Sequence, residues 1–492
     1  MKRLILLLLV CFASQHIEGQ DFQQYRQQVI RHYKDHRQGV LNRYADFIEQ
    51  SWQRFQAFKG ERRNNDSVPK PSLPPTLPQS SPLPNTPVRL PTPDAPQPLP
   101  KEKSQPPLPT MPSMPTVPPA APVPQQRFIF YGDTLQCRQM SPILLTGTDE
   151  KEVAKVWRRY HNTKEGSLTA QALLHVANER GLNDWLTIEM VRTYVETLLS
   201  SPSVAADRIV IEQFLLTQMG YDVRIARTDR QLLLLVPVKE TFYDQPYLEM
   251  NAQRFYLFKD RLCPIDEAEA HYFTYTLPEG TNAGHITSLL FNGERTLKLH
   301  TGFTHYCTID DGRLRVSLSF DKAALEALRH YPPMDVSNYA RSAVLPELHA
   351  LLWTELKSQL EGMTQREAVM ALMHFAQYAF SYATDGNQHG YEKPYFIEEN
   401  FYYPQNDCED RAVFLVNAVR ELLGLRSHLV QYPGHECTAI HFTDPTITGD
   451  GYLYKGELFI ICDPTYIGAS IGQCMPTYQQ VQPLIQLWEE NE

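Results

Sequence analysis

Several features that would place this 492-residue chain in a simple class are missing. Beyond the N-terminus, no stretch is apolar for the ~20 residues that a membrane helix needs. No strongly basic stretch is present and the net charge is −10, so we expect no nucleic-acid partner. Hydrophobic residues make up 42% of the chain and charged residues 21%, which excludes a wholly disordered or collagen-like protein.

Cysteine is scarce as well. The chain has 8 cysteines, too few for the disulfide framework of a small secreted domain. One lies in the N-terminal apolar run, and the others are Cys137, Cys263, Cys307, Cys408, Cys437, Cys462 and Cys474. This odd number leaves at least one thiol unpaired in a monomer. Histidine and cysteine also lack the paired short spacings of zinc sites, so we expect neither a metal nor a cofactor.

Residues 1–19 have the pattern of a secretory signal peptide. Lys2 and Arg3 precede a short apolar run, and small residues suited to cleavage follow as far as Gly19. The apolar run is too short to be a membrane helix. We therefore expect an exported protein that is periplasmic, secreted or associated with an outer membrane, and that has no transmembrane span.

The next two segments have unusual compositions. In residues 20–60, aromatic and valine side chains recur at steps of three, four or seven, which predicts one long amphipathic helix over 21–59. This helix either packs on the body of the protein or binds a partner or a second copy. Residues 61–126 contain 22 of the 38 prolines. Because proline disrupts both helices and sheets, we expect a disordered, largely extended linker here.

The rest of the chain predicts an α+β fold in three parts. Residues 127–268 show helical patterns followed by apolar strands, which is typical of an α/β domain. Residues 269–340 alternate apolar and polar side chains around turn signals such as Asp311-Gly312, which predicts a small all-β module. Residues 341–492 return to helices, then strands, and contain the residues most suggestive of catalysis.

Cys408 directly precedes a helix with a broad apolar face. The positive end of a helix dipole lowers the pKa of a thiol and favours its thiolate. Asp407, Glu409 and Asp410 oppose this effect, although they also stabilise the start of the helix. The dipole alone is therefore insufficient to activate the thiol, and a histidine partner is required. Cys408 could instead be a structural cysteine.

Two strands supply the partners. His435 opens a strand after a Pro-Gly turn, and Asp463 ends another strand directly before Pro464. Neighbouring strands lie ~4.8 Å apart, so the imidazole and the carboxylate can meet. Together with Cys408 they would form a nucleophile, a base and an orienting acid.

Each partner has an alternative. His441 lies on the same strand as His435, about 20 Å away, and Asp463 could merely cap a turn. An oxyanion donor is also needed. The backbone N–H of Cys408 is one natural donor, and the preceding loop offers a second from Tyr403, Gln405 or Asn406.

The motifs themselves resemble a known superfamily. The run NDCEDRA is similar to the GDCEDxA signature of bacterial transglutaminase-like cysteine proteinases. With YPGHECTAIHF and ICDPTY, it resembles the transglutaminase-like, papain-related superfamily, and in particular uncharacterised exported transglutaminase-domain proteins of Bacteroidetes. The match covers roughly residues 345–478. One departure is His435-Glu436-Cys437 where the family has His-Ala-Trp, which would alter the substrate groove.

This resemblance implies a papain-like or transglutaminase-like core in residues 341–492. It places the nucleophile at Cys408, the base at His435 and the orienting acid at Asp463. The expected activity is an exported cysteine peptidase or amidase that cleaves a peptide or protein substrate through a thioester. A protein cross-linking transglutaminase would use the same chemistry with an amine acceptor. A non-catalytic interaction or assembly protein, or a glycan- or peptide-binding protein, are further alternatives.

An internal repeat is also visible. The segment SVAADRIVIEQFLLTQMGYDVRI in the first half is similar to DCEDRAVFLVNAVRELLGLRSHL in the last region. Aligning Gly220 with Gly424 places these residues opposite one another: Val204 and Cys408, Gln231 and His435, and Asp260 and Asp463. We therefore hypothesise that residues 127–265 form a degenerate second transglutaminase-like core that lacks the cysteine and the histidine.

Overall fold

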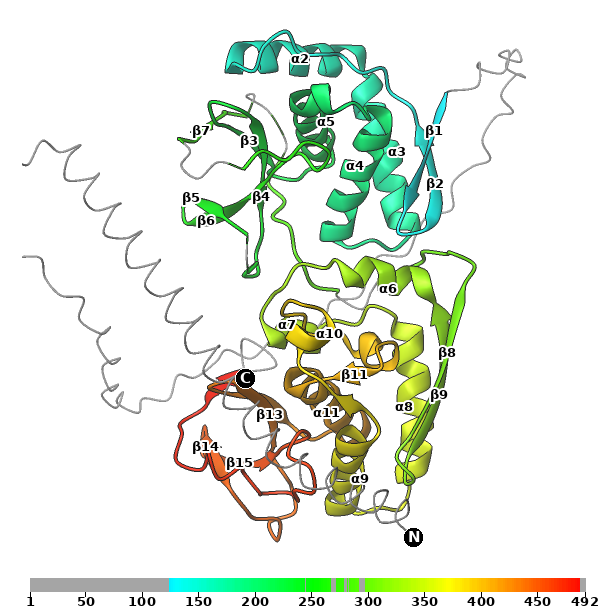
Figure 1. Ribbon diagram of the computed structural model, residues 1–492, viewed down its shortest axis with the longest axis vertical. Helices are drawn as coiled ribbons and strands as arrows, with labels where there is room; N and C mark the ends of the chain where they lie inside the picture. The colour runs from blue at the N-terminus through cyan, green and yellow to red at the C-terminus, as the bar shows by residue number, and fades with distance from the viewer. Residues whose placement is uncertain are drawn as a thin grey trace, which may run out of the picture. The chain divides into compact units, whose positions relative to one another are not determined.

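The computed structural model describes residues 124–486, apart from residues 244, 267–270, 278–280, 282 and 292–296. These residues belong to one unit of the chain, Met114–Glu492 (Figure 1). The predicted signal peptide, the predicted helix over 20–60 and nearly all of the predicted linker over 61–126 lie outside the described residues. Of the helices that are described, none is long and apolar enough to cross a membrane.

The described chain is α+β, as expected, and its first half leads from a hairpin through helices into a sheet (Figure 1). The elements that precede the sheet are β1 (Gln125–Phe130), β2 (Asp133–Arg138), α2 (Glu150–Thr163), α3 (Glu165–Glu179), α4 (Asp184–Leu198), η1 (Pro202–Val204) and α5 (Ala205–Gln218). The strands are β3 (Arg224–Arg227), β4 (Leu232–Pro237), β5 (Tyr247–Met250), β6 (Gln253–Phe258) and β7 (Phe273–Thr274). They form an antiparallel sheet in the order β5-β6-β4-β3-β7.

The second half follows the same plan. It begins with β8 (Thr304–Asp310), β9 (Arg315–Asp321), α6 (Lys322–Arg329), α7 (Val336–Ala340), α8 (Pro346–Leu360) and α9 (Gln365–Tyr378). Short elements follow: β10 (Ser381–Tyr382), α10 (Asp385–Gln388), η2 (Ile397–Phe401) and β11 (Gln405–Asn406). It ends with α11 (Cys408–Leu423), β12 (Ser427–Tyr432), β13 (His435–Ile440), β14 (Gly451–Tyr454), β15 (Glu457–Cys462) and β16 (Leu484–Gln486). The sheet order is β14-β15-β13-β12-β16.

The two sheets have the same strand order and register. In the first sheet Leu234 pairs with Phe258, as Thr438 pairs with Cys462 in the second. The other ladders correspond in the same way: Ile225–Leu234 with Leu429–Thr438, and Tyr247–Tyr256 with Gly451–Ile460. One constant shift in residue number relates all of these pairs. Helix α5 packs on β3 and β4 as α11 packs on β12 and β13. The shared helix–strand order that the repeat hypothesis requires is therefore present.

The register corrects one detail of the predicted repeat. It places Val204 opposite Cys408 and Gln231 opposite His435, as expected. However, because Phe258 corresponds to Cys462, the residue opposite Asp463 is Lys259, and Asp260 lies one position further on.

Residues 269–340 differ from the expected all-β module. In the described part of this range, β7 joins the first sheet, whereas the β8–β9 hairpin packs on α8. Isolated bridges join His285 to Tyr221 and Thr287 to Val238 of the first half. The alternating pattern of residues 315–320 is real, since β9 buries every second side chain. Alternation identifies a half-buried strand but not its pairing partner.

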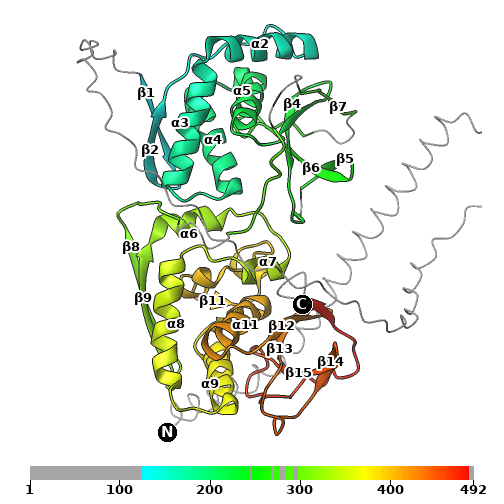
Figure 2. The ribbon, with the colours of Figure 1, turned by 180° about the vertical axis from the view of Figure 1, so that it is seen from behind.

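Helix α11 is buried on nearly all sides because it lies between the sheet and other helices. It contacts α8 and α9 as well as β12 and β13, and Figure 2 shows it beside these strands. Its side chains from Glu409 to Val419 are all buried. The helix ends at Gly424, whose φ of 62° is a left-handed conformation that favours glycine. Its first residue, Cys408, lies near Glu436 at the start of β13.

Candidate active site

The structure brings His435 and Asp463 together. Since Thr438 pairs with Cys462, the end of β15 leaves Asp463 beside the start of β13. The Nε2 atom of His435 lies 2.8 Å from Oδ2 of Asp463, and both residues are buried. This bond leaves Nδ1 of His435 for a second partner.

The surroundings fix the orientation of both side chains. Oδ1 of Asp463 accepts hydrogen bonds from the backbone N–H groups of Thr465 at 2.9 Å and Tyr466 at 3.0 Å. The His435 ring stacks on Tyr478 with a centroid distance of 5.4 Å and an interplanar angle of 8°. A histidine held in this way can act as a base whose tautomer the carboxylate determines.

Cys408 lies close to this pair at the start of α11. The backbone N–H of Glu436, the residue that follows His435, lies near enough to its sulfur to lower the pKa of the thiol. The thiol itself donates to Oε2 of Glu409 at 3.0 Å. In the described structure it makes no hydrogen bond to the His435 ring. Thus Cys408 reaches the first residues of β13, but its own hydrogen bond goes to a carboxylate.

A group of carboxyl side chains surrounds the thiol. Asp385, Asp407, Glu409, Asp410 and Glu436 are all buried, whereas Glu392 is exposed. Burial, together with the neighbouring carboxylates, raises the pKa of Asp385 and of Glu436 to about 8. The same causes raise the pKa of Glu409 to about 7. The pKa values of Asp407 and Asp410 are also raised well above the ordinary carboxyl range.

Burial and these acids together determine the protonation state of the thiol at rest. Partial burial, followed by the charges of Glu409 and Asp407, raises the pKa of the Cys408 thiol well above its ordinary value. The N–H of Glu436 acts in the opposite direction but is the weaker influence. The lowering of the thiol pKa that a helix dipole would give is therefore outweighed by burial and the acids. Cys408 is a neutral thiol at rest and needs a base to become a nucleophile.

Two residues near Cys408 have structural roles. Asp410 accepts the backbone N–H groups of Asp407 at 3.0 Å and Tyr395 at 2.8 Å, so it caps the helix and holds the preceding loop. The Asn406 amide bonds to Asn400 and accepts from the Arg411 guanidinium, both at 2.8 Å. Asn406 is thus already engaged on both sides of its amide.

Tyr403 and Gln405 are the remaining two of the three side chains expected as oxyanion donors.

His441, the alternative base, lies just beyond the other end of β13. Its Nδ1 atom is 3.0 Å from the backbone oxygen of Leu458.

Sequence reasoning did not identify Glu409 as the thiol's hydrogen-bond partner, nor the roles of Asp385, Glu392 and Glu436. Two of them, Glu409 and Glu436, directly follow Cys408 and His435 in the sequence, and this adjacency could have identified them. Asp385 and Glu392 come from a segment of α10 and irregular chain, where no periodicity indicates which side chains turn inward.

Some of these side chains could act as metal ligands. Ligand atoms of His435, Cys437 and Asp463 lie within 4.8 Å of one another. Two groups of three carboxylates have the same property: Asp385, Glu392 and Glu409, and Asp385, Asp407 and Asp410. Proximity of ligand atoms alone does not identify a metal site, so the expectation of no metal stays a prediction. None of the seven described cysteines forms a disulfide.

Comparison with known proteins adds no relative. No family model matches this chain, and neither a curated protein nor a solved structure matches it. The likeness to transglutaminase-like proteins therefore rests on the motifs around Cys408, His435 and Asp463.

Proposed function

We propose that the C-terminal half is a transglutaminase-like, papain-related cysteine hydrolase of peptide or amide bonds, in an exported protein. The observation that carries this proposal is the 2.8 Å bond between His435 and Asp463, together with a thiol at a helix start whose sulfur lies near the backbone of Glu436. A nucleophile, a base and an orienting acid at neighbouring element ends are what acyl transfer requires.

The first half-reaction forms a thioester. Cys408 attacks the carbonyl carbon of the substrate while its proton passes to Nδ1 of His435. Asp463 holds the Nε2–H and stabilises the imidazolium that results. The imidazolium then protonates the leaving amine, the C–N bond breaks, and an acyl thioester remains on Cys408.

The second half-reaction restores the enzyme. His435 takes a proton from water, and the hydroxyl attacks the thioester carbonyl. The C–S bond breaks, the carboxylic acid leaves, and the proton returns to the sulfur. The backbone N–H of Cys408 and a donor from Tyr403 or Gln405 would stabilise the oxyanion of both tetrahedral intermediates. An amine in place of water would give transamidation.

A non-catalytic role is the second proposal, and one specific observation favours it. The Cys408 thiol bonds to Glu409 and its pKa is raised, an arrangement that opposes thiolate formation at rest. In the hydrolase proposal the acids keep the thiol neutral until His435 accepts its proton. The two proposals differ in whether Cys408 reacts with a carbonyl-like electrophile.

Labelling with a peptidyl chloromethyl ketone distinguishes them. In the intact protein, peptide mapping by mass spectrometry should find Cys408 modified before the other partly exposed thiols, Cys263 and Cys307. A Cys408→Ala variant should stay folded and lose this adduct and any hydrolytic activity. Modification of Cys263 and Cys307 with Cys408 left intact would refute the hydrolase proposal.

A further inference from the structure

The first half contains a cavity at the place that corresponds to the candidate active site. The cavity has a volume of about 430 Å³. Its lining residues include Gln231, directly before β4, and Lys259, directly after β6. By the shared register these two residues take the places of His435 and Asp463. The position of the cysteine is Val204, so this half has no nucleophile there.

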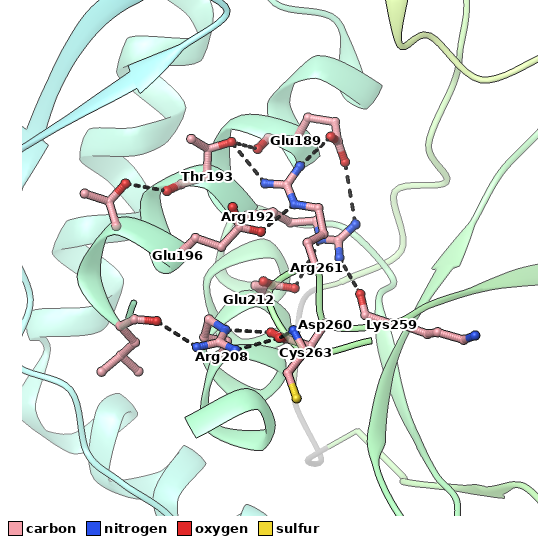
Figure 3. Close-up of polar contacts among 12 residues, drawn as sticks. Glu189, Arg192, Thr193, Glu196, Arg208, Glu212, Lys259, Asp260, Arg261 and Cys263 are labelled. Atoms are coloured by element: carbon pink, nitrogen blue, oxygen red, sulfur yellow. Dashed lines mark hydrogen bonds and ion pairs between the residues drawn. The ribbon is translucent and has the colours of Figure 1, made fainter. Parts of the chain in front are cut away.

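The arginines near the cavity serve the structure of this half (Figure 3). Arg208 is fully buried and forms a two-pronged ion pair with Asp260, with both N–O distances at 2.6 Å. Arg261 pairs with Glu189 at 2.7 Å, and Arg192 donates to the backbone oxygen of Lys259 at 2.6 Å. Their guanidinium groups are thus occupied by the protein's own oxygens.

Gln231 and Lys259 instead hold a short segment of the chain. The Gln231 side chain donates to the backbone oxygen of Ile265 at 2.7 Å. The Lys259 ammonium pairs with the carboxylate of Asp266. A backbone carbonyl and an acidic side chain, one residue apart, are the groups that any extended peptide with an acidic residue presents.

The contact with Asp266 is one that an external ligand can replace. The Asp266 side chain is 96% exposed and that of Lys259 is 39% exposed. Exposed ion pairs contribute little to stability, because water and salt screen both charges. A competing carboxylate would therefore meet little resistance at Lys259.

The cavity wall adds an apolar component. Leu233, Leu257, Phe258, Pro246, Pro264 and Tyr272 line it. The rest of the lining is polar, and apolar surface combined with placed polar groups is typical of ligand sites. The wall would suit the apolar residue that precedes the acidic one, as Ile265 precedes Asp266 in the chain.

We propose that the first half is a binding site for peptides that carry an acidic residue after an apolar one. Lys259 binds the ligand carboxylate and Gln231 binds the preceding backbone carbonyl. The segment Pro264–Asp266 occupies the same two groups when no ligand is present. This inference uses no residue of the proposed catalytic half and requires no chemistry there.

Fluorescence anisotropy on the full chain tests this site. The probe is a fluorescein-labelled peptide Ala-Pro-Ile-Asp-Ala with an amidated end, and its comparator has asparagine in place of aspartate. We expect the aspartate peptide to bind more tightly than the comparator. Lys259→Gln should weaken its binding about fivefold, in keeping with an exposed ion pair. Asp266→Asn should strengthen binding, since it removes the internal competitor.

Lys239→Gln is the matched control, because this exposed lysine of the same half is not part of the cavity lining. It should bind the peptide as the unaltered protein does. The proposal fails if the Asp266→Asn variant does not bind the aspartate peptide, or binds the asparagine peptide equally well. It also fails if Lys259→Gln and Lys239→Gln weaken binding alike. Because Asp266 is exposed, its variant remains informative even if Lys259→Gln does not fold.

Discussion

The thiol of Cys408 is subject to two opposing influences. The backbone N–H of Glu436 favours a thiolate, whereas burial and the charges of Glu409 and Asp407 disfavour it and prevail. Arg411 is the nearby cation, but its guanidinium hydrogen-bonds to Asn406 and to backbone oxygens of Gln377 and Phe380 rather than to the thiol. Proton transfer to His435 is therefore the step on which the proposed chemistry depends.

Replacing Glu409 with glutamine tests this balance. The charge of Glu409 raises the pKa of the Cys408 thiol, so Glu409→Gln should lower that pKa. Alkylation of Cys408 by iodoacetamide at pH 7 should then be faster by roughly several-fold. The pH dependence of the alkylation rate measures the effect. Glu421→Gln, at an exposed position of the same helix, should leave the rate unchanged. A slower rate in Glu409→Gln would instead identify Glu409 as the proton acceptor.

At the scale of elements, α5 and α11 occupy equivalent places but are held by different interactions. The start of α11 is capped by Asp410, whose carboxylate accepts the backbone N–H of Asp407. Helix α5 has no side-chain cap at Val204, and its first turns are joined to the chain after β6 by the buried ion pair of Arg208 with Asp260. The first half thus has a buried ion pair at the position where the second half has its candidate active site.

Breaking this pair should strongly destabilise the first half. Asp260→Asn leaves Arg208 buried without a countercharge, which costs about 3–5 kcal/mol. Urea denaturation followed by circular dichroism measures the loss. Asp222→Asn is the matched control, because it alters an Arg–Asp pair of similar geometry whose side chains are partly exposed. That variant should lose less than about 1 kcal/mol, and equal losses would contradict the assignment.

At the scale of the whole molecule, buried acids should control the pH dependence of stability. The pKa of Asp385 and of Glu436 is raised to about 8, and that of Glu409 to about 7. In the first half, burial raises the pKa of Glu212 to about 7. Between pH 4.5 and 8 the folded protein therefore binds more protons than the unfolded chain, so stability falls as the pH rises.

Urea denaturation at several pH values measures this trend. The free energy of unfolding should be highest near pH 5 and should fall steadily to about pH 8. In a Glu409→Gln, Glu436→Gln double variant the slope should be smaller, since two of the titrating groups are removed. A free energy that rises over this interval would show that the acids are ionised and well solvated in the folded state.

The sequence predicted features that local patterns encode. Cys408, His435 and Asp463 lie at element ends, as the apolar helix face, the Pro-Gly turn and Pro464 indicated. The duplicated order was also detectable, because Gly220 and Gly424 both follow an apolar helix.

Other features depend on pairing across the chain, which local patterns do not encode. The pairing of β4 with β6, rather than the spacing along the chain, shows that Lys259 is the residue of the first half that is equivalent to Asp463. For the same reason, the strands after residue 268 were assigned to a module of their own.

The central claim is that His435 is the base that activates Cys408. The most direct test measures the rate at which the peptidyl chloromethyl ketone alkylates Cys408 at pH 7. This rate is compared between the unaltered protein, His435→Ala and His441→Ala. Loss of a general base typically lowers a rate by about 10²-fold or more. The account predicts a loss of this size in His435→Ala, with the fold intact by circular dichroism, and an unchanged rate in His441→Ala. An unchanged rate in His435→Ala would contradict the account, because Cys408 would then react without the His435–Asp463 pair.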